Sequence, residues 1–126
     1  MPNMDLIQSL SAIAGNESVL TGEQAAPYYT DWRGRYSGSA LAVVFPSDTQ
    51  QVAAVVKLCA ANHIAIVPQG GNTSLCGASV PLQLGQQVVL NLSRMDRIRA
   101  VDPINYTMTA EAGCKLASLY QAAEQA

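Results

Sequence analysis

Apolar residues fall into short runs separated by polar segments, and these runs predict strands and helices in alternation. Continuous apolar runs too short for helices predict three buried strands, at 40–45, 64–67 and 87–92. Apolar positions repeat with helical spacing in three further segments, at 5–13, 52–59 and 115–126. Two alternating segments, 97–102 and 106–112, predict a hairpin around a Pro-Ile-Asn turn. The chain is therefore expected to form a small mixed sheet flanked by helices.

The first two strands and the helix between them form a predicted βαβ unit. Pro46 ends the first strand, and Ser47 and Gln50 have the spacing of a capping box, in which each side chain binds a free backbone N–H at the start of a helix. Asn62 is expected to adopt the left-handed conformation that ends this helix. Crossovers between parallel strands are right-handed as a rule, and ligands of open α/β sheets bind at the carboxyl ends of the strands. The segment after Val67 is thus a candidate ligand site.

A glycine-rich loop follows this strand, with the sequence PQGGNTSLCGASVP at 68–81. Pro68 is expected to end the strand, and Gly70, Gly71 and Gly77 to adopt positive φ or to let a ligand approach the main chain. Successive backbone N–H groups in such a loop form a concave site for phosphate oxygens. Side chains add neutral hydrogen-bonding groups, namely those of Asn72, Thr73, Ser74 and Ser79. Glycine-rich loops are also common on surfaces, so a phosphate site and an ordinary surface loop both stay open on this pattern alone.

Composition narrows the class of protein. The 126 residues are 49% hydrophobic and 13% charged, which fits one folded domain with a modest core and excludes a disordered chain. The formal net charge is −2, and the only basic cluster, at 94–99, is too small for a nucleic-acid surface. Three widely spaced cysteines predict neither disulfides nor a zinc site, and no segment has the pattern of a signal peptide or a membrane span. These features predict a soluble, cytoplasmic protein.

The order of residues in the loop resembles a known family. Pro-Gln-Gly-Gly-Asn-Thr followed by a Gly-x-x-Pro-like close is similar to the pyrophosphate loop of FAD-binding domains in the vanillyl-alcohol oxidase / p-cresol methylhydroxylase (PCMH) superfamily, and most similar to its D-2-hydroxyacid dehydrogenase branch. Two later stretches, at 92–98 and 111–114, resemble the same domain. The resemblance implies an α+β fold in which residues 40–126 form the first lobe of a PCMH-type FAD-binding domain, after a helix and an extended arm at 1–39.

The same resemblance implies which residues bind FAD. In the loop they are Pro68, Gln69, Gly70, Gly71, Asn72, Thr73, Ser74, Leu75, Gly77 and Ser79. Ala112 and Gly113, after the hairpin, are expected to pass close to the flavin. Relatives that attach flavin covalently through this loop have histidine in place of Asn72, so the resemblance implies non-covalent FAD. Ser74 and Ala78 stand where the family usually has glycine, and a need for positive φ there would cost about 1–2 kcal/mol and weaken flavin binding.

The resemblance also implies a longer protein. The last helix has no glycine, asparagine or proline at its end and no basic residue in its final turn, which indicates truncation. Related enzymes continue with a second lobe over the FAD and then a substrate domain that, in the hydroxyacid branch, carries metal ligands. No catalytic or metal-binding residue is therefore expected within residues 1–126, and the chain alone is not expected to be active. The substrate, the electron acceptor and the oligomeric state depend on residues outside this range.

For several residues the sequence leaves two roles open. His63, the only histidine, is either a solvated turn residue or a catalytic base. Cys76 either fills space in the loop or is a reactive thiol. Arg97 and Arg99 either lie on a solvated strand face or clamp a phosphate. The aromatic arm at 27–38 either covers an edge of the core or approaches the cofactor.

Three functions stay open at this point. The first, which the resemblance favours, is the FAD-binding part of an oxidoreductase that oxidises a small D-2-hydroxyacid such as D-lactate, glycolate or D-2-hydroxyglutarate. The second is another flavoenzyme of the same fold, such as an enolpyruvyl-UDP-sugar reductase or the flavin subunit of a molybdenum hydroxylase. The third is a stand-alone module that binds a nucleotide or phosphate without catalysis.

Overall fold

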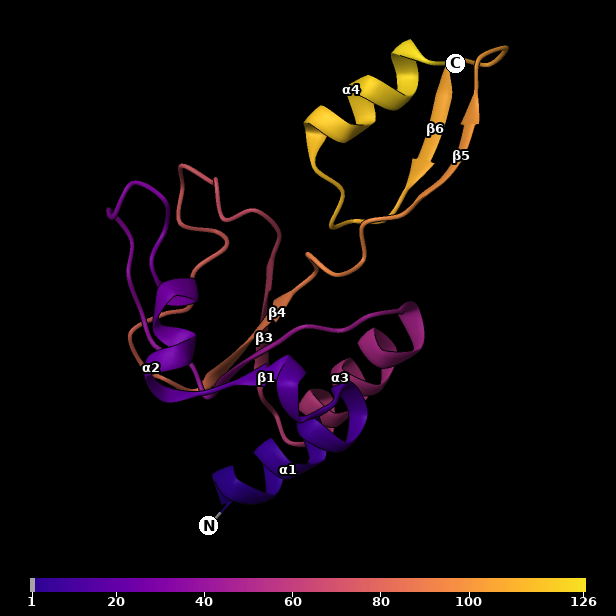
Figure 1. The fold of residues 1–126 in the computed structure, drawn as a ribbon. Coiled ribbons are helices and arrows are strands. Elements are labelled where there is room, and N and C mark those ends of the chain that lie inside the picture. Colours follow the sequence, from indigo (N-terminus) through magenta and orange to yellow (C-terminus); the bar gives the residue numbers. More distant parts are fainter. Residues whose placement is uncertain (1) are drawn as a thin grey trace.

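A computed structural model describes residues 2–126 (Figure 1). In chain order its elements are α1 (Pro2–Ala14), η1 (Asn16–Ser18), β1 (Val19–Leu20), α2 (Gly22–Ala25), η2 (Ala26–Tyr29), β2 (Ala42–Val44), α3 (Thr49–Ala61), β3 (Ala65–Gln69), β4 (Gln87–Asn91), β5 (Ile98–Asp102), β6 (Thr107–Ala110) and α4 (Leu116–Glu124). Every strand and helix expected from the apolar pattern is present. Figure 1 shows two parts, a larger one built on a sheet and a smaller one formed by β5, β6 and α4.

The main sheet has four strands in the order β1-β2-β4-β3. The strands β2, β4 and β3 are parallel, and β1 pairs antiparallel with β2 at one edge. The predicted βαβ unit is present as β2, α3 and β3, with β4 inserted between its two strands. This mixed sheet with its helices confirms the expected α+β class.

Pro68 does not end β3, contrary to the prediction, because the strand continues to Gln69. The reason is the position of β3 at the free edge of the sheet. An edge strand tolerates proline, since the missing N–H need not face a partner strand.

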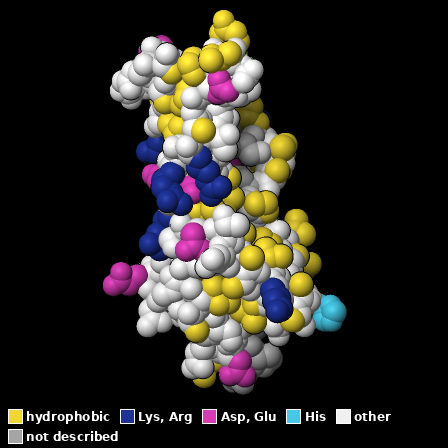
Figure 2. Space-filling model, turned by 90° about the vertical axis from the view of Figure 1, so that its right-hand side faces the viewer, with side chains coloured by type: hydrophobic (Ala, Val, Ile, Leu, Met, Phe, Trp, Pro, Cys, Tyr) yellow, Lys and Arg dark blue, Asp and Glu magenta, His cyan; other side chains and the backbone are white. Residues whose placement is uncertain are grey.

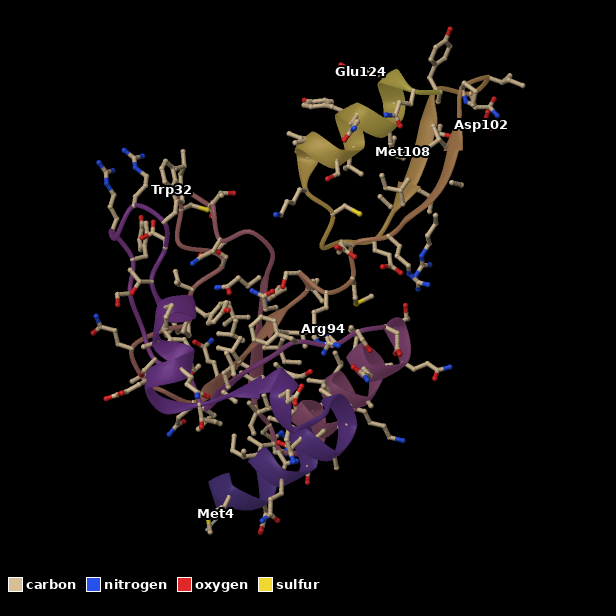
Figure 3. The ribbon with its side chains drawn as sticks, viewed as in Figure 1. Met4, Trp32, Arg94, Asp102, Met108 and Glu124 are labelled. Carbon is tan, nitrogen blue, oxygen red and sulfur yellow. The ribbon has the colours of Figure 1, made fainter. Side chains whose placement is uncertain are left out.

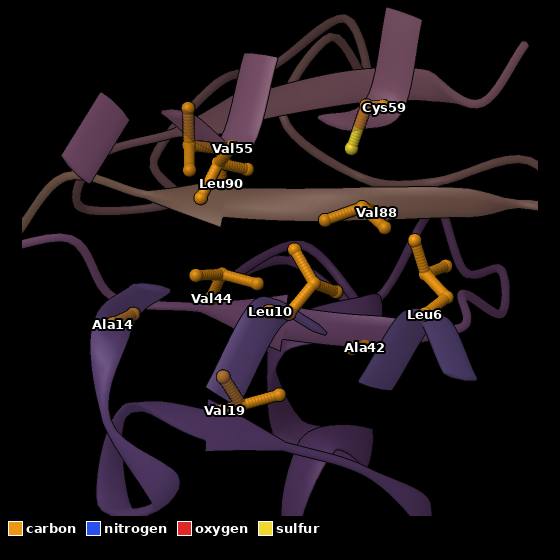
Figure 4. Close-up of a cluster of buried hydrophobic side chains, with 10 residues drawn as sticks. All are labelled: Leu6, Leu10, Ala14, Val19, Ala42, Val44, Val55, Cys59, Val88 and Leu90. Atoms are coloured by element: carbon orange, nitrogen blue, oxygen red, sulfur yellow. The ribbon is translucent and has the colours of Figure 1, made fainter. Parts of the chain in front are cut away.

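The core lies on both faces of the sheet because successive strand residues point to opposite sides. On one face, Leu10 of α1 and Val55 of α3 pack with Val44 and Val88, and all four side chains are fully buried (Figure 4). Fully burying a valine or leucine contributes roughly 1.5–3 kcal/mol. Because α1 belongs to this core, the segment before residue 40 packs into the same hydrophobic interior as the sheet.

On the opposite face, Val43 and Val89 are fully buried against Ala25 of α2 and Tyr29 of η2. The hydroxyl of Tyr29 donates a hydrogen bond to the carbonyl of Ala40 at 3.2 Å. This part of the aromatic arm therefore covers the core, as one of its two interpretations predicts.

The helix α3 begins and ends one residue later than the predicted signals. Asp48 is its N-cap, and the Asp48 carboxylate accepts the backbone N–H of Gln51 at 2.8 Å. The Gln51 side chain accepts the backbone N–H of Ser47, the residue before the cap. The arrangement is thus a variant of the capping box, shifted by one residue from the predicted pair Ser47 and Gln50. At the other end the left-handed residue is His63, with φ of 55°, and not Asn62.

The smaller part is a hairpin with a helix across it. The strands β5 and β6 pair antiparallel with a bulge near Ile98, and Asp102 organises the turn by accepting the backbone N–H groups of Ile104 and Asn105. At the base of the hairpin the buried carboxylate of Glu111 pairs with Arg97 at 3.0 Å and with Arg99 at 3.1 Å. Arg99 lies on β5 and Arg97 directly precedes it, and both exposed side chains bind the same glutamate. Basic side chains gather at the narrow middle of one face (Figure 2).

The ion pairs at Glu111 predict a pH dependence of stability. Hydrogen bonds from the Arg97 side chain and backbone, with a contribution from Arg99, lower the pKa of Glu111 from 4.5 to about 2. A carboxyl with a depressed pKa stabilises the fold above its unfolded pKa and loses that contribution as pH falls toward the folded value. In Glu111→Gln the contribution is absent at all pH values. We therefore expect the melting temperature of wild type to exceed that of Glu111→Gln at neutral pH, and the difference to shrink between pH 4.5 and about 2.

Thermal unfolding followed by circular dichroism over this pH range measures the difference. Glu17→Gln is the matched control, because Glu17 is exposed and the structure gives it no ion pair within residues 2–126. A wild-type advantage over Glu111→Gln that stays constant with pH would contradict the prediction.

Candidate functional site

The glycine-rich loop leaves β3 at the carboxyl edge of the parallel strands, where the βαβ pattern predicts a ligand site. Positive φ falls on Asn72, at 56°, and on Gly77, at 74°. Gly70 and Gly71 do not have positive φ, so of the two roles expected for them only close approach of a ligand to the main chain remains. Neither Ser74 nor Ala78 has positive φ, so the strain considered for these substitutions does not arise.

Gly70 and Gly71 provide open space beside unpaired backbone donors. A Cβ added at Gly70 would meet no protein atom within 4 Å, and one added at Gly71 would meet only the methyl group of Thr73 at 3.9 Å. Within residues 2–126, the backbone N–H groups of Gly70, Gly71 and Thr73 donate to no protein acceptor. Backbone N–H groups without an acceptor, next to open space, are suited to bind an anion.

A second wall faces this loop. The residue before α4 is Lys115, and its side chain does not cap the helix. The backbone N–H groups of Leu116 and Ala117 have no acceptor among the described residues. The free N–H groups of a helix N-terminus carry partial positive charge, and the ammonium group of Lys115 adds a full one. Both walls therefore favour a negatively charged group between them.

The two walls enclose a cavity of about 570 Å³. It is lined by Gly70, Gly71, Thr73, Ser93, Asp96, Ala112, Gly113, Cys114, Lys115, Leu116 and Ser118. Five residues that the sequence predicts at the site thus meet around one cavity: Gly70, Gly71, Thr73, Ala112 and Gly113. Lys115 is the only basic residue in this lining and Asp96 the only acidic one.

Three other predicted residues lie behind the loop and support it. Gln69 is 1% exposed, and its amide nitrogen donates to the carbonyls of Tyr28 and Ser79, at 2.8 Å each. Its amide oxygen accepts from the Asn91 side chain at 2.9 Å. The Asn72 side chain donates to the carbonyl of Thr30 and accepts from the Ser79 hydroxyl. Gln69, Asn72 and Ser79 therefore fix the loop to its surroundings and do not line the cavity.

The remaining predicted residues also lie outside the cavity lining, and they are Pro68, Ser74, Leu75 and Gly77. Gly77 packs under the ring of Tyr36, where an added Cβ would be 2.7 Å from the ring. The thiol of Cys76 is exposed, and its hydrogen bond with the Ser74 hydroxyl lowers the pKa of the thiol. This thiol is not among the groups that face the cavity.

Sequence reasoning missed six residues that line the cavity: Ser93, Asp96, Cys114, Lys115, Leu116 and Ser118. The only signal for them is their place in the chain, in the segment that follows β4, directly before the last helix or in its first turn. Sequence reasoning also predicted only one role for Gly113, which is to pass close to the flavin, and missed its role in packing. A Cβ at Gly113 would lie 1.9 Å from the carbonyl oxygen of Leu92 and 2.7 Å from that of Met95, so the close approach that glycine permits here is to backbone of the same chain.

The other residues considered for catalysis or anion binding lie away from this cavity. His63 is exposed in the turn after α3 and does not line the cavity. Arg97 and Arg99 are also absent from its lining, so they do not clamp an anion there. Among residues 2–126 no cluster of three His, Cys, Asp or Glu residues has the arrangement of a metal site. None of the described helices has the length and apolar character needed to span a membrane.

Comparison with known proteins identifies the domain. A family model described as an FAD binding domain matches residues 40–126. A probable D-2-hydroxyglutarate dehydrogenase of Oryza sativa is 36% identical over 118 residues, which are 93% of this chain and 21% of that protein. A D-2-hydroxyglutarate–pyruvate transhydrogenase of Saccharomyces cerevisiae is 33% identical over 128 residues, which are 95% of this chain and 25% of that protein. The chain thus spans about a fifth to a quarter of the length of these relatives.

Solved structures show the same fold. p-Cresol methylhydroxylase with bound substrate superposes with a TM-score of 0.82 at 27% identity, over 99% of this chain and 25% of that one. The family match covers well over half of the chain, and the superposition covers nearly all of it. This chain therefore belongs to the family of FAD-binding domains of the p-cresol methylhydroxylase type, found in flavoprotein oxidoreductases.

Proposed function

We propose that this chain is the non-covalent FAD-binding part of an oxidoreductase that oxidises a small D-2-hydroxyacid. The observation that carries the proposal is the cavity between the loop at Gly70–Thr73 and the N-terminus of α4. Free N–H groups on both walls, together with Lys115, match the two negative charges of the FAD diphosphate. The open space at Gly70 and Gly71 lets phosphate oxygens approach the main chain.

When bound, the flavin of FAD supplies the redox chemistry by accepting a hydride from the substrate, while the protein binds and orients it. The side chain of Asn72 is occupied by hydrogen bonds to Thr30 and Ser79. A carboxamide is not a nucleophile toward flavin, which supports dissociable FAD. The relatives' names, D-2-hydroxyglutarate dehydrogenase and D-lactate dehydrogenase, support a 2-hydroxyacid substrate.

Titration of the protein with FAD, followed by flavin fluorescence, tests cofactor binding. Reduction of the bound flavin without oxygen by D-2-hydroxyglutarate, D-lactate or glycolate, in the full-length protein that carries this domain, tests the substrate class. We expect loss of the yellow flavin absorbance with at least one of these acids. Flavin reduced by NADPH and reoxidised by an enolpyruvyl-UDP-sugar would instead favour a reductase of the same fold.

Gly70→Ala separates cofactor binding from folding. The added methyl group meets no protein atom, and φ of Gly70 is not positive, so we expect the stability of the FAD-free chain to be unchanged or raised by up to about 1 kcal/mol. The same methyl group takes space beside the cavity next to a free N–H group. We expect FAD to bind at least about tenfold more weakly, a loss of about 1.4 kcal/mol.

Urea unfolding of the FAD-free chain and FAD titration measure the two effects on the same preparation. Lys57→Met provides a control for both, because Lys57 is exposed on α3 and lies outside the cavity lining. Wild-type FAD affinity in Gly70→Ala would show that the cavity at this loop is not the diphosphate site.

A further inference from the structure

Trp32 is exposed on the arm before β2 and binds the glycine-rich loop from its outer side. The residue is 62% exposed. Figure 3 shows where its side chain lies on the arm. The indole Nε1–H donates to the carbonyl of Thr73 at 3.0 Å, and the backbone N–H donates to the carbonyl of Asn72 at 3.4 Å. One residue of the arm thus holds two consecutive carbonyls of the loop. An exposed tryptophan adds little to the core, so its contacts with the loop need another explanation.

The arm around Trp32 is itself held firmly. The carboxylate of Asp31 is buried and accepts the backbone N–H groups of Arg35 and Tyr36, which closes a tight turn. The backbone N–H of Asp31 donates to the carbonyl of Tyr36, and Thr30 pairs with Ser37 in an isolated bridge. Trp32 is therefore presented to the loop from an ordered turn.

The two held carbonyls also fix the directions of the N–H groups that follow them, because each peptide group is planar. In a trans peptide group the C=O and the following N–H point in opposite directions, and no cis peptide occurs in residues 2–126. When Trp32 holds the carbonyl of Asn72 toward the arm, the N–H of Thr73 points away from the arm. The loop lies between the arm and α4 (Figure 1), and Thr73 lines the cavity on the α4 side. The N–H of Thr73 therefore points toward the cavity.

We propose that Trp32 is a positioning residue, which acts from outside the cavity by holding the carbonyls of Asn72 and Thr73 on the arm side, so that the N–H of Thr73 faces the bound diphosphate. This inference rests on the proposed FAD site. It assigns the exposed tryptophan of the arm a role in cofactor affinity without any contact between its side chain and the cavity. Preorganised donors bind an anion more tightly because they need not reorient when it arrives.

Trp32→Phe tests the proposal, since it keeps an aromatic ring and the backbone N–H but removes the indole donor. We expect FAD to bind about three- to tenfold more weakly, the effect of losing one net hydrogen bond. Tyr36→Phe is the matched control: it also removes one polar group from an aromatic ring of the arm, and the Tyr36 hydroxyl forms no hydrogen bond to the loop. The melting temperature of the FAD-free chain should stay close to wild type in both variants.

A second readout needs no cofactor. Residual dipolar couplings report the direction of each N–H bond. In Trp32→Phe the coupling of Ser74, on the peptide group that loses the indole hydrogen bond, should change most. A smaller change should follow at the neighbouring Thr73, and none in β3 and β4. Unchanged FAD affinity in Trp32→Phe, or unchanged couplings at Thr73 and Ser74, would overturn the role of Trp32. If wild type itself binds no FAD, the proposed function fails, and the couplings alone then decide whether Trp32 sets these peptide planes.

Discussion

Gln69→Leu is expected to lower the free energy of unfolding by about 3–5 kcal/mol, although leucine is similar in size and more apolar. Gln69 is almost fully buried at the end of β3, and its side chain makes three hydrogen bonds with buried or partly buried partners. Leucine makes none of them. The carbonyls of Tyr28 and Ser79 and the amide of Asn91 would stay in the interior without partners, at about 1–3 kcal/mol for each unpaired group.

Each of these partners belongs to a different part of the site. Tyr28 lies in the arm, Ser79 near the end of the loop, and Asn91 at the end of β4. Asn91 also accepts the backbone N–H of Ser93, which lines the cavity. Loss of the Gln69 amide should therefore loosen the arm, the loop and the strand end together, and FAD affinity should fall with stability.

Urea unfolding measures the loss, and Gln50→Leu is the matched control because Gln50 is exposed on α3, where a substitution should cost within about 0.5 kcal/mol. The double variant Gln69→Leu/Asn91→Leu is informative, because removal of both members of a buried pair costs less than the sum of the single losses. A loss below about 1 kcal/mol in Gln69→Leu would mean that the network contributes little.

Gln69 also illustrates what the sequence predicts about this site and what it does not. The order of residues from Pro68 to Thr73 predicted the loop, its place after a strand and the family to which the chain belongs. It did not predict that Gln69 points into the interior, because the strand was expected to end at Pro68. One further strand residue decides which side chains point inward, since successive residues of a strand face opposite sides.

The apolar pattern predicted the strands and helices well because each depends on residues close in sequence. The short strand β1 was not predicted, since two residues carry no periodicity and Val19 and Leu20 pair only because β2 lies beside them. The second wall of the cavity was missed for a related reason. Lys115 and Asp96 lie near the loop only because the hairpin packs on the end of β4. No local sequence pattern encodes this packing.

The second substitution with a large expected effect is at Gly113, where the hairpin part of the chain packs against the end of β4. Gly113→Ala is expected to destabilise the chain by at least about 3 kcal/mol, at the upper end of the costs of overpacking. The new Cβ would lie 1.9 Å from the Leu92 carbonyl oxygen and 2.7 Å from that of Met95. Both neighbours are backbone atoms, which cannot rotate away as a side chain can, and the backbone N–H of Gly113 already donates to Met95 at 2.8 Å.

Gly70→Ala is the matched control for Gly113→Ala. Both substitutions add one methyl group at the same cavity, and neither glycine has positive φ, so only the surroundings of the added group differ. Gly70→Ala should weaken FAD binding with stability retained, whereas Gly113→Ala should lower both, because the hairpin and α4 can no longer pack against the end of β4. Hydrogen exchange should then become faster across β5, β6 and α4 in Gly113→Ala and stay slow in Gly70→Ala. Equal urea midpoints for the two variants would contradict this account, because they would mean that the chain accommodates a side chain where its backbone segments now touch.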